Sequence, residues 1–160
     1  MSGMTDWDAW HQPYEQPDSP LSRRLRIIQE HIRAWMDETA PLPVTVVSSC
    51  AGDGRDLLQV LADRPDAHRV TATLLEYDAR NVARAREAIG RAGLREVTVT
   101  CVDAGTTDAY VGAVPADLVL LCGVFGNVSD DDVHRTVRAL PQFCAPGPWW
   151  SGRAIVVHPT

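Results

Sequence analysis

Apolar segments typical of β-strands alternate with segments of helical periodicity along most of this chain, and this alternation restricts the possible folds most strongly. Between the strand-like segments, apolar residues recur at steps of three and four. We expect five strands, at residues 44–47, 70–75, 97–102, 116–122 and 154–157. Alternating strands and helices predict a parallel sheet with right-handed crossovers. The sequence therefore predicts an α/β fold: a doubly wound, mostly parallel sheet with helices on both faces.

Capping residues indicate the start of one predicted helix and the end of another. Ser19 followed by Pro20 is typical of a helix start. Gly93 is expected to close another helix in the left-handed conformation. Residues 1–19 mix aromatic side chains with Asp, Gln and Pro, which is typical of an irregular arm. We therefore divide the chain into an N-terminal arm, residues 1–19, and one domain, residues 20–160.

The net charge and the cysteine spacing narrow the classes of partner. The formal net charge is −6, which argues against a surface that neutralises many phosphates. The four cysteines form no C-x-x-C pair, so we expect reduced thiols, no metal site and a cytoplasmic protein. No apolar run approaches the roughly 18 residues that a membrane-spanning helix needs. We expect neither nucleic acid nor a membrane as partner.

The ends of the first two strands carry the first signs of a ligand site. The first strand runs into small residues with Gly52 and Gly54, which permit a sharp turn and a close approach of backbone to ligand. Glu76 follows this turn by roughly the 20 residues at which nucleotide-binding folds place a carboxylate for ribose hydroxyls. The alternative is that Glu76 only begins the next helix.

The third and fourth strands end in residues of the same kind. Asp103 and Ala104 follow the third strand, where the carboxylate could accept a hydrogen bond from an exocyclic adenine amine. A simple loop or helix-capping role for Asp103 is the alternative. Gly123 follows the fourth strand and permits close approach there.

Together these motifs resemble the class I S-adenosylmethionine-dependent methyltransferases, which have a Rossmann-like fold. The resemblance extends from Val44 to about Leu140. It implies that the glycine loop cradles the amino-acid part of S-adenosylmethionine, that Glu76 binds ribose, and that Asp103 meets adenine with Tyr77 against the ring. The cofactor-binding residues implied are Ala51, Gly52, Asp53, Gly54, Glu76, Tyr77, Asp103, Ala104 and Gly123.

The chain departs from the family pattern at the start of the glycine loop. Residues 48–50 read Ser-Ser-Cys where the family has an acid, any residue and glycine. Asp53 and Asp56 are the remaining candidates to meet the cofactor's ammonium group. The acceptor motif of amino-group methylating enzymes, with its Pro-Pro pair, is absent after the fourth strand, which favours a small-molecule methyl acceptor. We assign no catalytic residue; His11, Tyr14 and His134 are available bases.

The C-terminal part also departs from the family pattern, because only five strands fit where the family sheet has seven. The domain thus looks C-terminally short and lacks the last two strands. A second copy or a partner subunit is expected to cover this side.

Two other functions are compatible with the same residues. A cofactor-binding but inactive domain or subunit would explain the altered glycine loop. An NAD-dependent oxidoreductase would also use a glycine loop and Glu76, but Leu57 stands where a complete G-x-G-x-x-G motif needs its third glycine.

Overall fold

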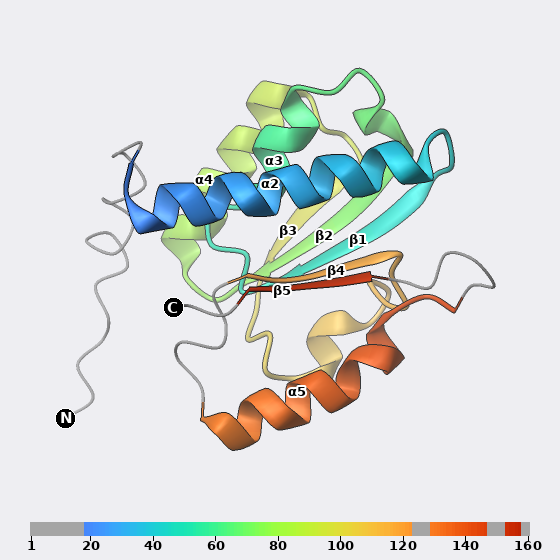
Figure 1. The fold of residues 1–160 in the computed structure, drawn as a ribbon. Helices are drawn as coiled ribbons and strands as arrows, with labels where there is room; N and C mark the ends of the chain where they lie inside the picture. Colours follow the sequence, from blue (N-terminus) through green and yellow to red (C-terminus); the bar gives the residue numbers. More distant parts are fainter. Residues whose placement is uncertain (1–17, 123–128, 147–152, 158–160) are drawn as a thin grey trace.

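The computed structural model describes residues 18–122, 129–146 and 153–157 (Figure 1). The described elements are, in chain order, α2 (Pro20–Thr39), β1 (Val44–Ser49), α3 (Arg55–Ala62), the 3-10 helix η2 (Ala67–Arg69), β2 (Val70–Glu76), α4 (Ala79–Ala92), β3 (Val97–Cys101), the 3-10 helix η3 (Thr107–Tyr110), β4 (Leu118–Cys122), α5 (Asp130–Phe143) and β5 (Arg153–Val157). The predicted alternation of strands and helices is confirmed.

The strands form one five-stranded sheet in the order β3-β2-β1-β4-β5, and every pairing is parallel. The chain runs outward from β1 through β2 to β3, then returns to the other side of β1 for β4 and β5. Between β1 and β4 the direction of winding reverses, and open α/β sheets bind ligands at the carboxyl ends of the strands near such a point. The predicted fold class is confirmed.

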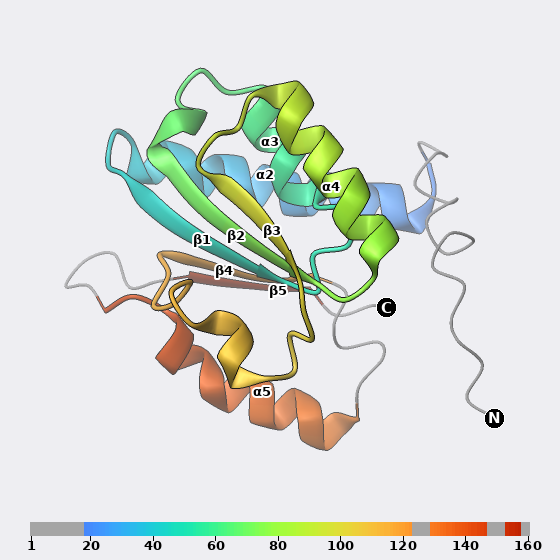
Figure 2. The ribbon, with the colours of Figure 1, turned by 180° about the vertical axis from the view of Figure 1, so that it is seen from behind.

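Helices cover both faces of the sheet, as Figures 1 and 2 show. α2, α3 and α4 lie on one face, whereas α5 and η3 lie on the other. Leu118 and Leu120 of β4 enter the core under α2–α4, and Val119 and Leu121 enter the core toward α5. This alternation explains the continuously apolar sequence of β4, because a parallel strand covered on both faces has no polar side.

The predicted helix ends are confirmed, whereas strand ends shift by one or two residues. Ser19 Oγ accepts a hydrogen bond from Ser22 N at 3.0 Å, and Gly93 closes α4 with a φ of 65°. Ala116, expected in the fourth strand, instead forms an isolated bridge with Cys144. β1 continues to Ser49, two residues beyond the predicted strand.

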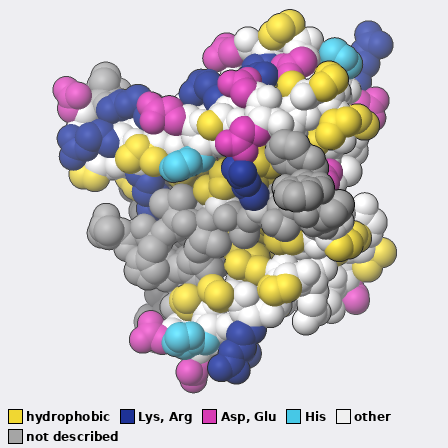
Figure 3. Space-filling view, turned by 45° about the vertical axis from the view of Figure 1, so that its right-hand side comes forward, with side chains coloured by type: hydrophobic (Ala, Val, Ile, Leu, Met, Phe, Trp, Pro, Cys, Tyr) yellow, Lys and Arg dark blue, Asp and Glu magenta, His cyan; other side chains and the backbone are white. Residues whose placement is uncertain are grey.

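The face of the molecule shown in Figure 3 carries mixed charge. In Figure 3, acidic and basic side chains are interspersed across the upper part of the view, and neither sign forms a continuous patch. No described helix combines the length and the apolar character required to cross a membrane.

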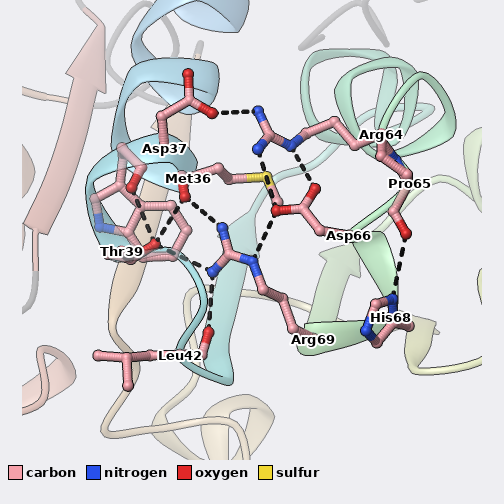
Figure 4. A network of polar contacts seen from close by, with 10 residues as sticks. Met36, Asp37, Thr39, Leu42, Arg64, Pro65, Asp66, His68 and Arg69 are labelled. Atoms are coloured by element: carbon pink, nitrogen blue, oxygen red, sulfur yellow. Dashed lines mark hydrogen bonds and ion pairs between the residues drawn. The ribbon is translucent and has the colours of Figure 1, made fainter.

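A network of ion pairs lies at the amino-terminal end of the sheet, where β1 and β2 begin (Figure 4). Its centre is the buried Arg69 guanidinium group. That group donates to the Asp66 carboxylate at 2.9 Å, the Thr39 hydroxyl at 3.2 Å, the Leu42 carbonyl at 2.9 Å and the Met36 carbonyl. Arg64 donates to Asp66 at 2.8 Å and to Asp37 at 2.7 Å. The network satisfies carbonyl groups at the end of α2 and joins α2 to the segment before β2.

Candidate functional site

The carboxyl ends of β1, β2 and β3 bring the predicted site residues to one edge of the sheet. Ser49 at the end of β1 lies opposite Leu75, and Glu76 at the end of β2 lies opposite Cys101. Backbone bonds continue this alignment past the strands, from Ala51 N to the Leu75 carbonyl at 3.0 Å. The glycine loop, Glu76 and the turn after β3 are therefore neighbours.

The glycine loop makes a tight turn that requires left-handed backbone. Cys50, Gly52 and Gly54 have φ values of 50°, 59° and 72°. A Cβ atom at Gly54 would lie 2.5 Å from Leu74 Cδ2 and 2.9 Å from Leu58 Cδ1, so a side chain is excluded there by space as well as by conformation. The loop consequently enters α3 in close contact with β2.

Glu76 holds the loop and the start of α4 together. Its side chain is buried, and the residue is 8% exposed. One carboxylate oxygen accepts from Gly52 N at 2.7 Å and the other from Asp78 N at 2.8 Å. The N-cap of α4 is Asp78 rather than Glu76. Because Glu76 also binds the glycine loop, its role extends beyond the start of that helix. Each carboxylate oxygen has more than one acceptor position, so the group can still accept hydroxyl hydrogens from a ligand.

Tyr77 and Asp103 lie beside Glu76 in the chain and in the sheet, respectively. The Tyr77 residue is 78% exposed, which is unusual for an aromatic side chain and leaves it accessible to a flat ligand. Asp103 is exposed, and its Oδ1 accepts from Gly105 N at 2.8 Å. Asp103 therefore stabilises its own turn, as the loop alternative predicted, and presents its carboxylate at the same edge.

Cys50 places a thiol among these acids. Burial, followed by the negative charges of Glu76 and Asp103, raises the pKa of the Cys50 thiol to about 11. The thiol is therefore neutral at pH 7, and Cys50 occupies a left-handed position that favours glycine. The missing glycine was visible in the sequence, but the conformation of its replacement was not.

Asp53 and Asp56, the two candidates to meet the cofactor's ammonium group, lie in different surroundings from each other. Asp53 forms an ion pair with Arg55 and also accepts from Arg55 N at 3.2 Å. Asp56 is buried, accepts from Leu57 N at 2.8 Å and lies near the Cys122 thiol, and burial raises the pKa of its carboxyl. The structure thus brings Asp53 to the loop surface with a basic partner and places Asp56 inside.

Sequence reasoning missed Tyr110, at the end of η3. Its hydroxyl contacts Ser49 Oγ at 2.8 Å and the Ala104 carbonyl at 2.9 Å. A signal was present, because Tyr110 is an isolated aromatic residue among small and polar residues between β3 and β4. Its partners were not visible, since Ser49 lies 61 positions away.

Some predicted positions lie outside the described residues, namely Gly123, His11 and Tyr14. His134 is exposed on α5, on the opposite face of the sheet from α3 and α4. Among the residues that the structure describes, no three His, Cys, Asp or Glu side chains are grouped to hold a metal ion.

A groove of about 690 Å³ also lies between α3 and α4. It is lined by Asp53, Arg55, Leu58, Gln59, Ala62, Arg84, Glu87, Ala88, Arg91 and Ala92. Glu76, Tyr77 and Asp103 are not among these residues. The groove therefore adjoins the glycine loop at Asp53 but does not include the acids at the ends of β2 and β3.

Solved structures similar to this chain include S-adenosylmethionine-dependent methyltransferases. The magnesium protoporphyrin IX methyltransferase of Synechocystis PCC 6803, with bound S-adenosylmethionine, matches with a TM-score of 0.62 and 14% identity over 87% of this chain and 66% of its own. A methyltransferase from Thiobacillus denitrificans, in complex with S-adenosylhomocysteine, matches with a TM-score of 0.58 and 16% identity over 92% of this chain and 54% of its own. PKMT2 from Rickettsia typhi, also with S-adenosylhomocysteine, matches with a TM-score of 0.53 and 17% identity over 65% of this chain and 19% of its own.

These similarities establish the fold. No protein-family model matches the amino-acid sequence, and no curated protein matches it by sequence. The chain has the fold of the S-adenosylmethionine-dependent methyltransferases and spans between 19% and 66% of the length of the three proteins named. The resemblance inferred from the sequence motifs is confirmed at the level of the fold.

Proposed function

We propose that this domain binds S-adenosylmethionine at the carboxyl ends of β1, β2 and β3 and transfers its methyl group to a small molecule. The observation that carries the proposal is the buried Glu76 carboxylate, held by Gly52 N of the glycine loop at 2.7 Å. This contact holds the carboxylate beside the glycine loop, where a carboxylate that binds the ribose diol is needed. The shared methyltransferase fold supplies the second line of support.

The residues fit the separate parts of this cofactor. Glu76 can accept hydrogen bonds from both ribose hydroxyls, and its charge would repel a phosphate at that position. The exposed Tyr77 ring can lie against adenine, and Asp103 can accept from the adenine amine. Backbone from Ala51 to Gly54 can approach the amino-acid part, because the loop carries few side-chain atoms.

Methyl transfer from S-adenosylmethionine needs little acid or base catalysis by side chains. When bound, S-adenosylmethionine supplies a methyl group already activated by a positively charged sulfur. The work of the chain is to bind, to orient the acceptor and to exclude water. A small acceptor agrees with the net charge of −6 and with the mixed surface charge in Figure 3, neither of which favours a polyanion.

A cofactor-binding domain without its own transferase activity is the second candidate. The left-handed Cys50 in place of glycine and the Asp53–Arg55 pair favour it, because both alter the part of the loop that would receive the amino-acid moiety. The third candidate, an NAD-dependent oxidoreductase, has no complete glycine motif to support it.

Calorimetric titration with S-adenosylhomocysteine and S-adenosylmethionine tests the proposal. We expect micromolar binding that weakens by about 30-fold in Glu76→Ala, because two hydrogen bonds to a charged acceptor are lost. Tyr77→Ala should weaken binding by about 10-fold without loss of stability, since the ring is exposed and stacking on a base contributes roughly 1–3 kcal/mol.

Glu87→Ala is the matched control, because Glu87 is an exposed acid on α4 and is not one of the residues proposed to bind the cofactor. Circular dichroism must show that every variant is folded. Tighter binding of NADH than of either sulfur ligand would favour the oxidoreductase. No binding of either sulfur ligand to folded wild-type protein would refute the proposal, and binding without transfer in an acceptor screen would favour the inactive domain.

A further inference from the structure

The Tyr110 hydroxyl joins two loops of the proposed site. Ser49, which it contacts at 2.8 Å, is the last residue of β1, directly before the turn that contains Cys50. Ala104, whose carbonyl it contacts at 2.9 Å, directly follows Asp103. The hydroxyl thus spans from the start of the glycine loop to the turn after β3.

The direction of each hydrogen bond follows from the chemistry. A carbonyl oxygen can only accept, so the phenol donates its hydrogen to Ala104. The phenol oxygen must then accept from the Ser49 hydroxyl. Burial raises the pKa of Tyr110, which keeps the phenol protonated and able to donate at neutral pH.

The Tyr110 ring is buried in the core between the sheet and α5. The residue is 6% exposed, and its ring stacks on Phe143 with centroids 4.7 Å apart and an angle of 10° between the planes. Phe143 is itself anchored, because its carbonyl accepts from Ala116 N at 2.8 Å. A fixed ring gives the hydroxyl a fixed position relative to β1 and to the turn after β3.

Packing of the core explains the ring but does not explain the hydroxyl. Phenylalanine would fill the same space and form the same stack, whereas a buried hydroxyl is unfavourable unless it is hydrogen-bonded. Both of its bonds go to residues that adjoin the site rather than to α5 or the centre of the core. The hydroxyl group therefore contributes to the arrangement of the loops at the strand ends, not to the packing of the core.

We propose that Tyr110 is a positioning residue, whose hydroxyl sets the separation between the glycine loop and the Asp103 turn in the cofactor site. The proposal rests on the proposed function, since it concerns the fit of S-adenosylmethionine between these two loops. The hydrogen bonds of the Tyr110 hydroxyl go to neither of the side chains proposed to bind the cofactor at this edge, Glu76 and Asp103. It acts through the Ala104 carbonyl and the Ser49 side chain.

Tyr110→Phe removes the hydroxyl and keeps the ring. We expect S-adenosylhomocysteine to bind about 10-fold more weakly, because the Asp103 turn is no longer fixed. Ser49→Ala, which leaves the bond to Ala104 intact, should weaken binding by about 3-fold. In a double-mutant cycle, Tyr110→Phe should add little to the loss of affinity caused by Asp103→Ala, because both changes act on the same turn.

Hydrogen exchange in the free protein tests the tether without a ligand. The amides of Gly105 and Thr106 are bonded to Asp103 at 2.8 Å and 3.2 Å, and we expect them to exchange about 10-fold faster in Tyr110→Phe. Unchanged affinity in Tyr110→Phe, or affinity losses that add fully with Asp103→Ala, would overturn the positioning role. If Tyr110→Phe exchanges faster but wild-type protein binds no S-adenosylhomocysteine, both proposals for the cofactor are overturned and Tyr110 is only a structural tether.

Discussion

Three carboxylates, one at the amino end of the sheet and two at the carboxyl end, are held in different ways. At the amino end, Asp66 accepts from the guanidinium groups of Arg64 and Arg69 (Figure 4). At the carboxyl end, Glu76 and Asp103 accept from backbone amides. Basic side chains neutralise the first carboxylate, whereas backbone amides fix the other two in place and leave their charge for a ligand. We infer that the amino end serves stability and the carboxyl end serves binding.

The largest expected effect is the loss of Arg69. In Arg69→Ala, carbonyl groups at the end of α2 and the Asp66 carboxylate lose a buried donor, so we expect a loss of about 4 kcal/mol in the free energy of unfolding. Thermal denaturation should show a Tm lower by roughly 10 °C. The affinity of the folded variant for S-adenosylhomocysteine should not change.

Arg91→Ala is the control for this comparison. Arg91 is 73% exposed in an ion pair of 3.6 Å with Glu87, so its loss should change stability by less than about 0.5 kcal/mol. Equal effects of the two substitutions would contradict the structural role of the amino-end network, as would a large loss of ligand affinity in Arg69→Ala.

Gly54→Ala should affect stability and binding together. The position combines a φ of 72° with a Cβ that would lie 2.5 Å from Leu74, and we expect a loss of about 3 kcal/mol in the free energy of unfolding. Gly93→Ala meets the same conformational penalty at a φ of 65° but has open space, so it should lose only about 1 kcal/mol. Urea denaturation measures both values.

Ligand affinity distinguishes the two glycines further. Gly54→Ala should weaken S-adenosylhomocysteine binding because the loop must shift, whereas Gly93→Ala should not. If the two variants lose equal stability, steric contact with Leu74 does not control this turn.

The smallest expected effect concerns the pH dependence of stability. The guanidinium groups of Arg64 and Arg69 hold the pKa of the Asp66 carboxyl well below its usual range. Because the folded pKa is lowered, the stabilisation is complete above the unfolded pKa of about 3.9 and is lost as the pH falls below it. Asp66→Asn should lose about 1 kcal/mol at pH 7, a modest value because the side chain is 28% exposed.

Unfolding followed between pH 6 and pH 2 checks this expectation. The stability of wild-type protein should fall more steeply with decreasing pH than that of Asp66→Asn. Parallel curves would show that the Asp66 carboxylate contributes no pH-dependent stability.

Local signals made the fold predictable, whereas distant contacts did not. Ser19 and Gly93 act on backbone within a few residues, so their capping roles are visible in the sequence. The spacing between the glycine loop and Glu76 can likewise be read directly from the sequence. In contrast, Arg69 bonds to Met36 across 33 positions, and Tyr110 bonds to Ser49 across 61. Such contacts depend on how helices and strands pack and leave no periodic pattern.

The bond between Glu76 and Gly52 has a consequence for the thermodynamics of binding. Because folding alone already orients this carboxylate and orders the loop beside it, a ligand that binds there meets a preorganised acceptor. Little conformational entropy remains to be lost at that point when the ligand arrives. The backbone around Glu76 should accordingly look alike in the free and the bound protein.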